Sequence, residues 1–342
     1  MGKKVAILTG GGDYPGINPV IRAIVRKGLN EGYEILGIKN GWKGLIEKDV
    51  VPLDLNSVSG ILPKGGTILG TSRTNPYKDK KDVDKVKENF KALKIEVLIA
   101  IGGEDTLGVA NRLYKEGLNI VGVPKTIDND LSATDRTFGF DTAVNIATEA
   151  IDRIHTTAES HHRVMVVEVM GRHSGWIGLE AGIAGGADAI LIPEFPIDID
   201  EICTLIKKRY NRGKNFSILV VAEGAKFKEE QVLQEKELDA FGHVRLGGIG
   251  QVLSKEIEKR TGFETRVTVL GHIQRGGTPT AYDRVLATRY GVKAMELVIE
   301  GKFGQMVSLQ GNEIISVPLE KAVGTLKTVP VELYNIAKIF FG

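Results

Sequence analysis

The sequence predicts an α/β fold of two doubly wound lobes, each built on a mostly parallel sheet, with a ligand site in the cleft between them. Short apolar runs alternate with longer amphipathic segments along the chain, which indicates βαβ units. The apolar runs are continuous, so the sheets are expected to be covered on both faces. A length of 342 residues suits two domains better than one.

The individual elements follow from these patterns. Strands are expected at 5–9, 34–38, 96–101, 119–123, 164–169, 188–193, 217–224 and 265–271. Amphipathic helices are expected at 83–94, 142–160, 199–213 and 246–262, and a further helix is expected to begin at Ile17 or Asn18. The charged stretch 225–245 interrupts the alternation and is expected to be a surface insertion. A boundary between the lobes is expected near residue 140.

Composition excludes several classes of protein. The 45 Lys and Arg residues nearly balance the 43 Asp and Glu residues, so no global field favours nucleic acid or a membrane surface as a partner. One cysteine, Cys203, excludes a disulfide framework and a cysteine metal cluster. No apolar stretch reaches the ~18 residues of a membrane span, and the N-terminus leads into a strand pattern rather than a signal peptide. A cytoplasmic protein is therefore expected.

Two glycine-rich loops in the first half are candidates for binding an anion, because α/β sheets bind ligands where their strands end. The stretch "TGGGDYPG" (9–16) precedes a helix and either presents backbone amides to a phosphate or forms an ordinary tight turn. It matches neither the Rossmann nor the Walker A motif. In the second loop, "KGGTILGTSRTNP" (64–76), Arg73 is either a bridge between two anionic groups or a solvated side chain.

Two further strand ends carry carboxylates. Glu104 and Asp105 directly follow two glycines in "IGGEDTLG", an unexpected pair in a loop suited to an anion. In "VPKTIDND", Asp128 is a candidate general base toward a hydroxyl, whereas a cap in a solvated turn explains Asp130 equally well.

The second half supplies cations around two expected strands. Arg163 and Arg172 flank the strand at 164–169, and Arg266, His272 and Arg275 lie in or after the strand at 265–271. Because a guanidinium matches the oxygens of a phosphate, these residues suit a sugar phosphate as ligand.

Seven motifs in sequence order resemble the phosphofructokinase family, from the first strand to about residue 300: "GGGDYPGIN", "GGTILGTSR", "GGEDT", "PKTIDND", "VMGRHSG", "AEG" and "GHIQRGG". The resemblance implies the phosphofructokinase fold and phosphoryl transfer to the 1-hydroxyl of fructose 6-phosphate, with Mg²⁺ as cofactor. It also implies a homo-oligomer, a tetramer or a dimer. The lobe that binds the phosphoryl donor is expected at 1–139 plus about 275–325. The lobe that binds fructose 6-phosphate is expected at 140–274 plus about 326–342.

The resemblance also implies roles for single residues. Asp128 matches the proton acceptor, Glu104 the magnesium ligand, and Gly12 and Arg73 contacts to the donor phosphates. The positions implied to bind the sugar substrate are Thr126, Ile127, Asp128, Arg163, Met170, Gly171, Arg172, Glu223, Arg266, His272, Ile273, Gln274 and Arg275. Within that set, Arg163 and Arg266 match arginines that reach the sugar phosphate of a neighbouring subunit, and Arg172 matches a contact to the transition state.

Two departures from the ATP-using pattern bear on the donor. Asp105 stands where those members have a glycine that lets the α-phosphate of ATP pass, and Lys125 stands where they have another glycine. A carboxylate about 4 Å from that phosphate repels it by ~4 kcal/mol at an effective dielectric of 20, roughly a thousandfold in affinity. Lys125 is suited to neutralise the leaving phosphate of pyrophosphate. Asp128, Lys125, Asp105 and Arg172 are therefore the expected catalytic set, and Asp105 and Lys125 also belong to the expected donor site.

These departures resemble the pyrophosphate-dependent branch of the family, whose reaction runs in both directions and serves glycolysis and its reversal. Two alternatives remain open from the sequence: an ATP-dependent phosphofructokinase, and a non-catalytic sensor of sugar phosphates on the same scaffold. Tyr14 also departs from the family, which usually has a small residue beside the donor site, and the sequence does not reveal its effect.

Overall fold

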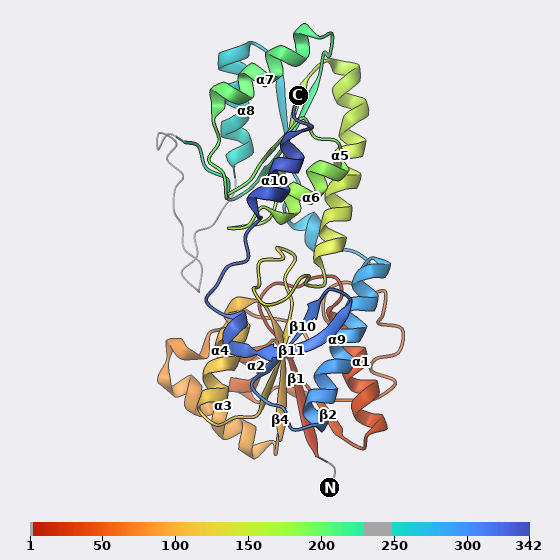
Figure 1. Cartoon of the computed structure of the whole chain (residues 1–342). Helices are drawn as coiled ribbons and strands as arrows, with labels where there is room; N and C mark the ends of the chain where they lie inside the picture. Colours follow the sequence, from red (N-terminus) through yellow and green to blue (C-terminus); the bar gives the residue numbers. More distant parts are fainter. Residues whose placement is uncertain (1–2, 229–247) are drawn as a thin grey trace.

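The computed structural model describes residues 3–228 and 248–342, which form two lobes joined at a waist (Figure 1). The lower lobe of Figure 1 contains a seven-stranded sheet in the order β11-β10-β5-β4-β1-β2-β3. Its strands are β1 (Lys4–Thr9), β2 (Glu34–Ile38), β3 (Val50–Leu53), β4 (Val97–Gly102), β5 (Ile120–Pro124), β10 (Gln305–Gln310) and β11 (Glu313–Pro318). The β2–β3 and β10–β11 pairs are antiparallel, and the other pairs are parallel.

Helices cover both faces of this sheet, as the continuous apolar strands predict. Val5 and Ile7 of β1 pack on one face against α1 (Ile17–Asn30) and α9 (Ala281–Ile299). Ala6 and Leu8 point to the other face, which is covered by three helices: α2 (Trp42–Glu47), α3 (Lys80–Ala92) and α4 (Glu104–Lys115). This packing leaves the carboxyl ends of β1, β4 and β5 directed toward the upper lobe (Figure 1).

The upper lobe contains a four-stranded, wholly parallel sheet in the order β7-β8-β6-β9. The strands are β6 (Val164–Val169), β7 (Ala189–Leu191), β8 (Ser217–Ala222) and β9 (Thr265–Val269). The helices α5 (Phe140–His161), α6 (Trp176–Ala184) and α10 (Val331–Lys338) pack on one face, and α7 (Ile199–Asn211) and α8 (Ile249–Thr261) on the other. Three short 3-10 helices complete the chain: η1 (Pro76–Lys78), η2 (Gly271–Arg275) and η3 (Leu319–Ala322).

The expected α/β fold is confirmed, and each of the eight expected strands is present with its ends shifted by at most three residues. The four expected helices are present, and α1 begins at Ile17. The expected insertion at 225–245 needs a correction at its start, because Ala225 is buried and Phe227 pairs with Ile197, so these residues belong to the upper lobe. The rest of that stretch, from residue 229, lies outside the described residues. Within the described ranges, no helix is both long and apolar enough to cross a membrane.

Candidate active site

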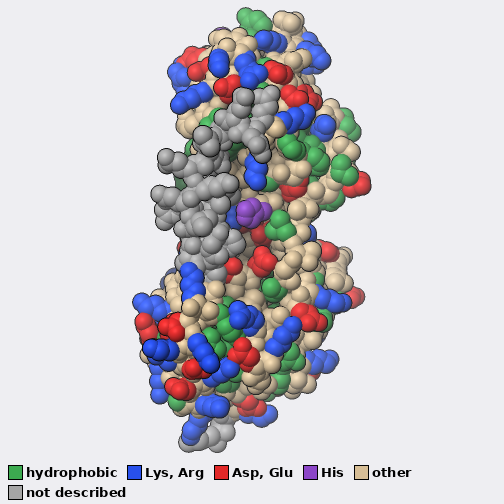
Figure 2. All heavy atoms as spheres, turned by 90° about the vertical axis from the view of Figure 1, so that its left-hand side faces the viewer, with side chains coloured by type: hydrophobic (Ala, Val, Ile, Leu, Met, Phe, Trp, Pro, Cys, Tyr) green, Lys and Arg blue, Asp and Glu red, His purple; other side chains and the backbone are tan. Residues whose placement is uncertain are grey.

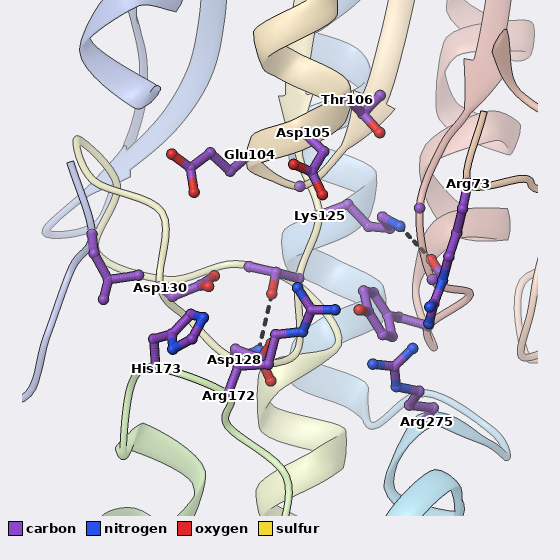
Figure 3. Close-up of a pocket in the computed structure, with 16 residues that line it drawn as sticks. Arg73, Glu104, Asp105, Thr106, Lys125, Asp128, Asp130, Arg172, His173 and Arg275 are labelled. Carbon is purple, nitrogen blue, oxygen red and sulfur yellow. Dashed lines mark hydrogen bonds between the residues drawn. The ribbon is translucent and has the colours of Figure 1, made fainter. Parts of the chain in front are cut away.

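A pocket lies at the waist and takes its lining from both lobes, with acidic side chains and a histidine visible around the hollow in Figure 2. Four carboxylates and four cations face this pocket (Figure 3). The lining residues are Gly11, Gly12, Tyr14, Arg73, Gly103, Glu104, Asp105, Thr106, Lys125, Thr126, Asp128, Asp130, Arg172, His173, Arg275 and Leu326. Mixed charge at this density is typical of a site that binds a multiply charged ligand rather than an apolar one.

Lys125 closes one end of the pocket against the first glycine loop. It directly follows β5, and only 1% of its surface is exposed. Its Nζ donates a hydrogen bond of 2.7 Å to the carbonyl oxygen of Gly10 and another to that of Gly12. Burial, and after it the positive charge of Arg275, lower the pKa of Lys125 to about 7. A phosphate bound beside Nζ would favour the charged ammonium and raise this pKa again.

Glu104 and Asp105 form the first turn of α4, and Figure 3 shows both side chains directed into the pocket. The N-terminus of a helix attracts anions, so carboxylates in the first turn are stabilised there and compete with any external anion. Glu104 Oε1 also accepts a hydrogen bond of 3.1 Å from the backbone N–H of Gly324. The arrangement places two carboxylates at the pocket-facing N-terminus of α4.

The oxygen-rich lining fits Mg²⁺, which prefers carboxylate and phosphate oxygens. Glu104, Asp105, Asp128 and Asp130 all face the pocket. Within residues 3–228 and 248–342, however, no three acidic, histidine or cysteine side chains form a preformed metal cluster. That is the donor set expected when a magnesium ion takes one or two carboxylates from the protein and its remaining ligands from a substrate phosphate and water.

Asp128 lies in the loop between β5 and α5, beneath the carboxylates of α4. Its backbone N–H donates to Thr126 Oγ1 at 3.1 Å, and the next residue, Asn129, takes a positive φ of 51°. The Oδ1 atom of Asp128 is buried and accepts no hydrogen bond from any residue that the structure describes. Burial, and after it the neighbouring charge of Asp130, raise the pKa of Asp128 to about 7. A general base works best with a pKa near the working pH, so this carboxylate is poised to accept a proton from a hydroxyl at neutral pH.

Arg172 enters the pocket from the upper lobe, after the end of β6. Its backbone N–H donates to Glu223 Oε1 at 3.3 Å, and burial raises the pKa of that glutamate. Residue 224 has to be glycine, because a Cβ there would overlap the carbonyl oxygen of Arg172. Close backbone packing between the ends of β6 and β8 therefore fixes the backbone of Arg172, and Figure 3 shows its guanidinium above Asp128.

Gln274 and Met170 hold Arg275 beside Arg172. Gln274 is fully buried, and its Oε1 accepts a hydrogen bond of 3.4 Å from the backbone N–H of Met170. Arg275 Nε in turn lies 3.4 Å from the sulfur of Met170. Gln274 and Met170 thus support the site from behind rather than lining the pocket.

Tyr14, whose effect the sequence did not reveal, lies between two of the cations. Lys125 Nζ is 4.5 Å from the centre of its ring, and the guanidinium carbon of Arg275 is 5.1 Å from it. The ring belongs to a loop of the lower lobe but packs in the apolar cluster of the upper lobe, and burial raises the pKa of the phenol to about 12. The face of an aromatic ring attracts cations, so Tyr14 offsets the repulsion between Lys125 and Arg275.

Not every expected site residue reaches this pocket. Arg163 precedes β6 and pairs with Glu264 at 2.9 Å, and Arg266 in β9 pairs with the same glutamate. Six residues of strand, roughly 20 Å, separate Arg163 from the pocket end of β6, and neither Arg163 nor Arg266 lines the pocket of its own protomer. His272 and Ile273 do not line the pocket either, and 68% of Ile273 is exposed.

Seven lining residues were absent from the expected site: Gly11, Tyr14, Gly103, Thr106, Asp130, His173 and Leu326. Thr106 and Asp130 lie within the motifs "GGEDT" and "PKTIDND", and His173 directly follows Arg172, so proximity to a motif was a usable signal for these three. Leu326 comes from a distant segment with no recognisable pattern. Only the folded chain reveals its place.

Comparison with known proteins agrees with this geometry. Residues 4–298 match the family model described as phosphofructokinase. The chain belongs to the phosphofructokinase family. It is 60% identical to a protein of Streptomyces coelicolor named pyrophosphate--fructose 6-phosphate 1-phosphotransferase, over 99% of this chain and 100% of that protein.

Relatives whose names specify ATP are nearly as similar to this chain. A Corynebacterium efficiens protein named ATP-dependent 6-phosphofructokinase is 54% identical over 99% of this chain and 99% of that one. A crystal structure of Pichia pastoris phosphofructokinase in the T-state superposes with a TM-score of 0.83 at 36% identity, over 99% of this chain and 39% of that one. The comparisons thus establish the family and its fold.

Proposed function

We propose that this phosphofructokinase transfers a phosphoryl group from pyrophosphate to the 1-hydroxyl of fructose 6-phosphate, giving fructose 1,6-bisphosphate and orthophosphate. The observation that carries the proposal is the pair of Asp105 and Lys125 at the donor end of the pocket. Asp105 repels the α-phosphate of a nucleotide, whereas the buried ammonium of Lys125 suits the compact charge of a leaving phosphate. The name of the Streptomyces coelicolor relative agrees with this donor.

The pocket residues divide the chemistry among them. Asp128 accepts the proton of the 1-hydroxyl as that oxygen attacks the transferred phosphoryl group, and the P–O bond to the leaving orthophosphate breaks. Arg172 stabilises the charge on the transferred group, and Arg275 binds the sugar substrate. Glu104 would hold Mg²⁺ together with phosphate oxygens, and the ion would supply neutralisation of phosphate charge there.

Reversibility follows from the donor. Because the pyrophosphate bond supplies less driving force than ATP, the reaction runs in both directions, and we assign the protein a role in glycolysis and in its reversal. The donor binds to the lobe of residues 1–139 and about 275–325, and the sugar to the lobe of 140–274 and about 326–342. The enzyme works in the cytoplasm.

We also propose that the active enzyme is a homo-oligomer, a tetramer or a dimer. Arg163 and Arg266 lie outside the pocket of their own protomer, at the amino end of β6 and in β9. Together with the family resemblance, this position supports a role in which they complete the sugar-phosphate site of a neighbouring subunit.

The proposal is tested by initial rates of the purified protein with fructose 6-phosphate and Mg²⁺, supplied with either pyrophosphate or ATP. Fructose 1,6-bisphosphate is detected by coupling to aldolase, and the Asp128→Asn variant serves as the inactive control. Turnover with pyrophosphate and little or none with ATP is expected. Equal or better turnover with ATP would favour the second candidate, an ATP-dependent phosphofructokinase, which the name of the Corynebacterium efficiens relative suggests.

A further inference from the structure

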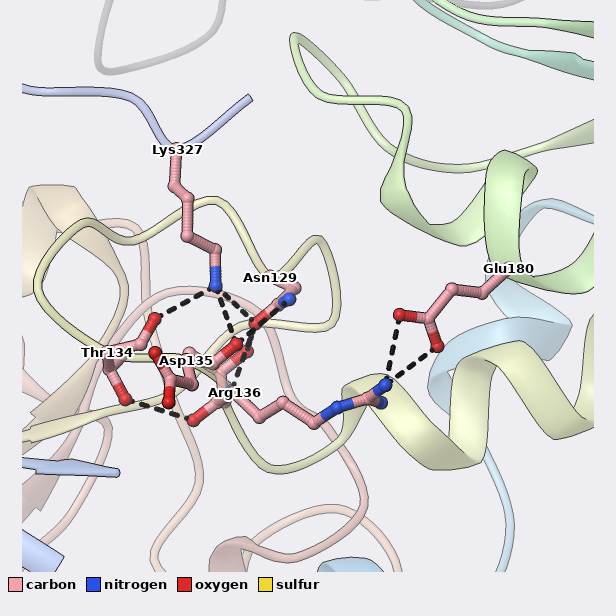
Figure 4. A network of polar contacts seen from close by, with 7 residues as sticks. Asn129, Thr134, Asp135, Arg136, Glu180 and Lys327 are labelled. Carbon is pink, nitrogen blue, oxygen red and sulfur yellow. Dashed lines mark hydrogen bonds and ion pairs between the residues drawn. The ribbon is translucent and has the colours of Figure 1, made fainter. Parts of the chain in front are cut away.

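Lys327 lies where the chain passes from η3 in the lower lobe to α10 in the upper lobe (Figure 4). Its backbone joins segments of both lobes. The N–H of Lys327 donates to the carbonyl oxygen of Asp130 at 2.8 Å, and the preceding residue, Leu326, pairs with Leu131. The carbonyl oxygen of Lys327 accepts hydrogen bonds of 3.0 Å from Ser174 Oγ and 3.0 Å from Trp176 Nε1.

The side chain of Lys327 binds the loop that carries Asp128. Its Nζ donates to Asn129 Oδ1 at 3.0 Å, to Thr134 O at 2.9 Å and to Asp135 O at 2.8 Å (Figure 4). An ammonium has three protons, so each has an acceptor. Asn129 lies between the two pocket carboxylates in sequence and holds a left-handed backbone, a conformation that costs free energy for any residue other than glycine.

The charge of Lys327 is needed for this arrangement, because a neutral amine has one proton fewer to donate. Burial lowers the pKa of Lys327 to about 8. Asp135, Asp130 and Glu180 raise the pKa, and Arg136 lowers it, so the groups that face the ammonium partly offset the effect of burial. Arg136 is itself paired with Glu180 at 3.0 and 3.1 Å across the lobes.

We propose that Lys327 is a positioning residue that holds the loop of Asp128 against the loop of Arg172. The ammonium fixes Asn129, the residue beside the base, while the backbone carbonyl fixes Ser174, two residues after the guanidinium. Lys327 does not line the pocket, so it acts through these loops and touches no substrate. The role rests on the proposed function, in which both groups act on one transferred phosphoryl.

The expected signature of Lys327→Met is a kcat lowered about 10- to 100-fold with the KM for pyrophosphate within about twofold, because misalignment costs rate rather than donor binding. The matched control is Lys321→Met, which removes an exposed lysine from the same crossover and should change neither constant. Thermal melting of each variant reports the folded fraction, so that kcat refers to folded protein.

Chemical rescue of the variant distinguishes the effect of the ammonium charge from the effect of side-chain packing. In Lys327→Cys, alkylation with bromoethylamine rebuilds an ammonium of similar reach, and wild-type protein treated in the same way controls for the buried Cys203. Recovery of kcat is expected. The wild-type kcat should also fall above about pH 8, where the ammonium of Lys327 loses its proton. In the alkylated variant this fall in kcat should occur at lower pH, because the sulfur lowers the pKa of the ammonium.

An unchanged kcat in Lys327→Met, a raised KM with kcat intact, or no recovery after alkylation would overturn the proposal. If Lys327→Met fails to fold, the wild-type pH profile decides, and a kcat that stays constant from pH 7.5 to 9.5 contradicts the role. If the wild-type enzyme uses only ATP, the proposed donor is wrong, and the same comparison made with ATP still tests Lys327.

Discussion

Replacing the buried base should make the protein more stable and inactive. Asp128 is 5% exposed, its Oδ1 accepts no hydrogen bond within the described part of the chain, and burial raises its pKa from 3.8 to about 7. A carboxyl with a raised pKa binds its proton in the folded state and loses it in the unfolded state between about pH 4 and pH 7. Folding stability therefore falls as pH rises through this window.

The magnitude follows from 1.36 kcal/mol per pKa unit. Burial of Asp128 costs the folded state about 4 kcal/mol at pH 8, and only about 1 to 2 kcal/mol at pH 5, where the folded carboxyl is protonated, relative to a group that does not titrate. Asp128→Asn removes this cost with an isosteric side chain. Its gain in unfolding free energy over wild type should therefore be larger at pH 8 than at pH 5 by about 3 kcal/mol, or several degrees in Tm.

The assay is thermal melting of both proteins at pH 5 and pH 8, together with the rate of fructose 1,6-bisphosphate formation. Loss of a general base should lower kcat about 100- to 10,000-fold. Comparing the two proteins at each pH cancels the contribution to stability of all titratable groups that they share. The buried-base reasoning would be refuted if the variant were less stable than wild type at pH 8, or if the difference in unfolding free energy between the two proteins did not grow with pH. Either result would count even if activity were lost.

Three other substitutions test separate parts of the pocket. Asp105→Gly combined with Lys125→Gly should raise kcat/KM with ATP relative to pyrophosphate by up to about 1,000-fold, and an unchanged donor ratio would refute the filter. Tyr14→Leu should raise the KM for both substrates about 3- to 30-fold, because it removes two cation–π contacts, whereas Tyr14→Phe should stay near wild type; equal effects of Leu and Phe would contradict this role. Gly224→Ala should cost about 3 kcal/mol of stability in chemical denaturation, since its Cβ overlaps the backbone of Arg172, and a neutral result would show that the loop relaxes.

Most of the buried parallel strands of the fold could be read from the sequence, whereas β3 and β11, the antiparallel edge strands of the seven-stranded sheet, could not. The strands β1, β4, β6 and β8 are continuous apolar runs because both of their faces are covered. In contrast, β3 and β11 lie at the edges of the seven-stranded sheet and are antiparallel to their neighbours. Pro52 within β3 is tolerated there because an edge strand leaves one row of N–H groups unpaired, yet in sequence it argues against a strand.

The helix α9 was missed for a related reason. It packs against α1 and lies close to β5, β10 and α5, so apolar residues occur on several of its sides. An amphipathic period of 3.6 residues therefore does not stand out in its sequence.

The candidate site was predictable where its residues belong to a local motif. Asp128, Lys125 and Arg172 follow strands directly, and strand ends of parallel sheets converge. Tyr14 and Lys327 were not predictable, because their contacts join distant parts of the chain. Lys327 and Asn129 lie 198 residues apart in sequence, and nothing in either segment indicates that they meet.

The most direct test of the proposed donor is the reverse reaction, followed by ³¹P NMR. The purified enzyme is supplied with fructose 1,6-bisphosphate, orthophosphate and Mg²⁺, with no nucleotide present. A pyrophosphate-dependent enzyme should produce pyrophosphate and fructose 6-phosphate in equal amounts, and Asp128→Asn should produce neither. Consumption of fructose 1,6-bisphosphate only when ADP is added, with ATP as the product, would contradict the assignment of pyrophosphate as donor.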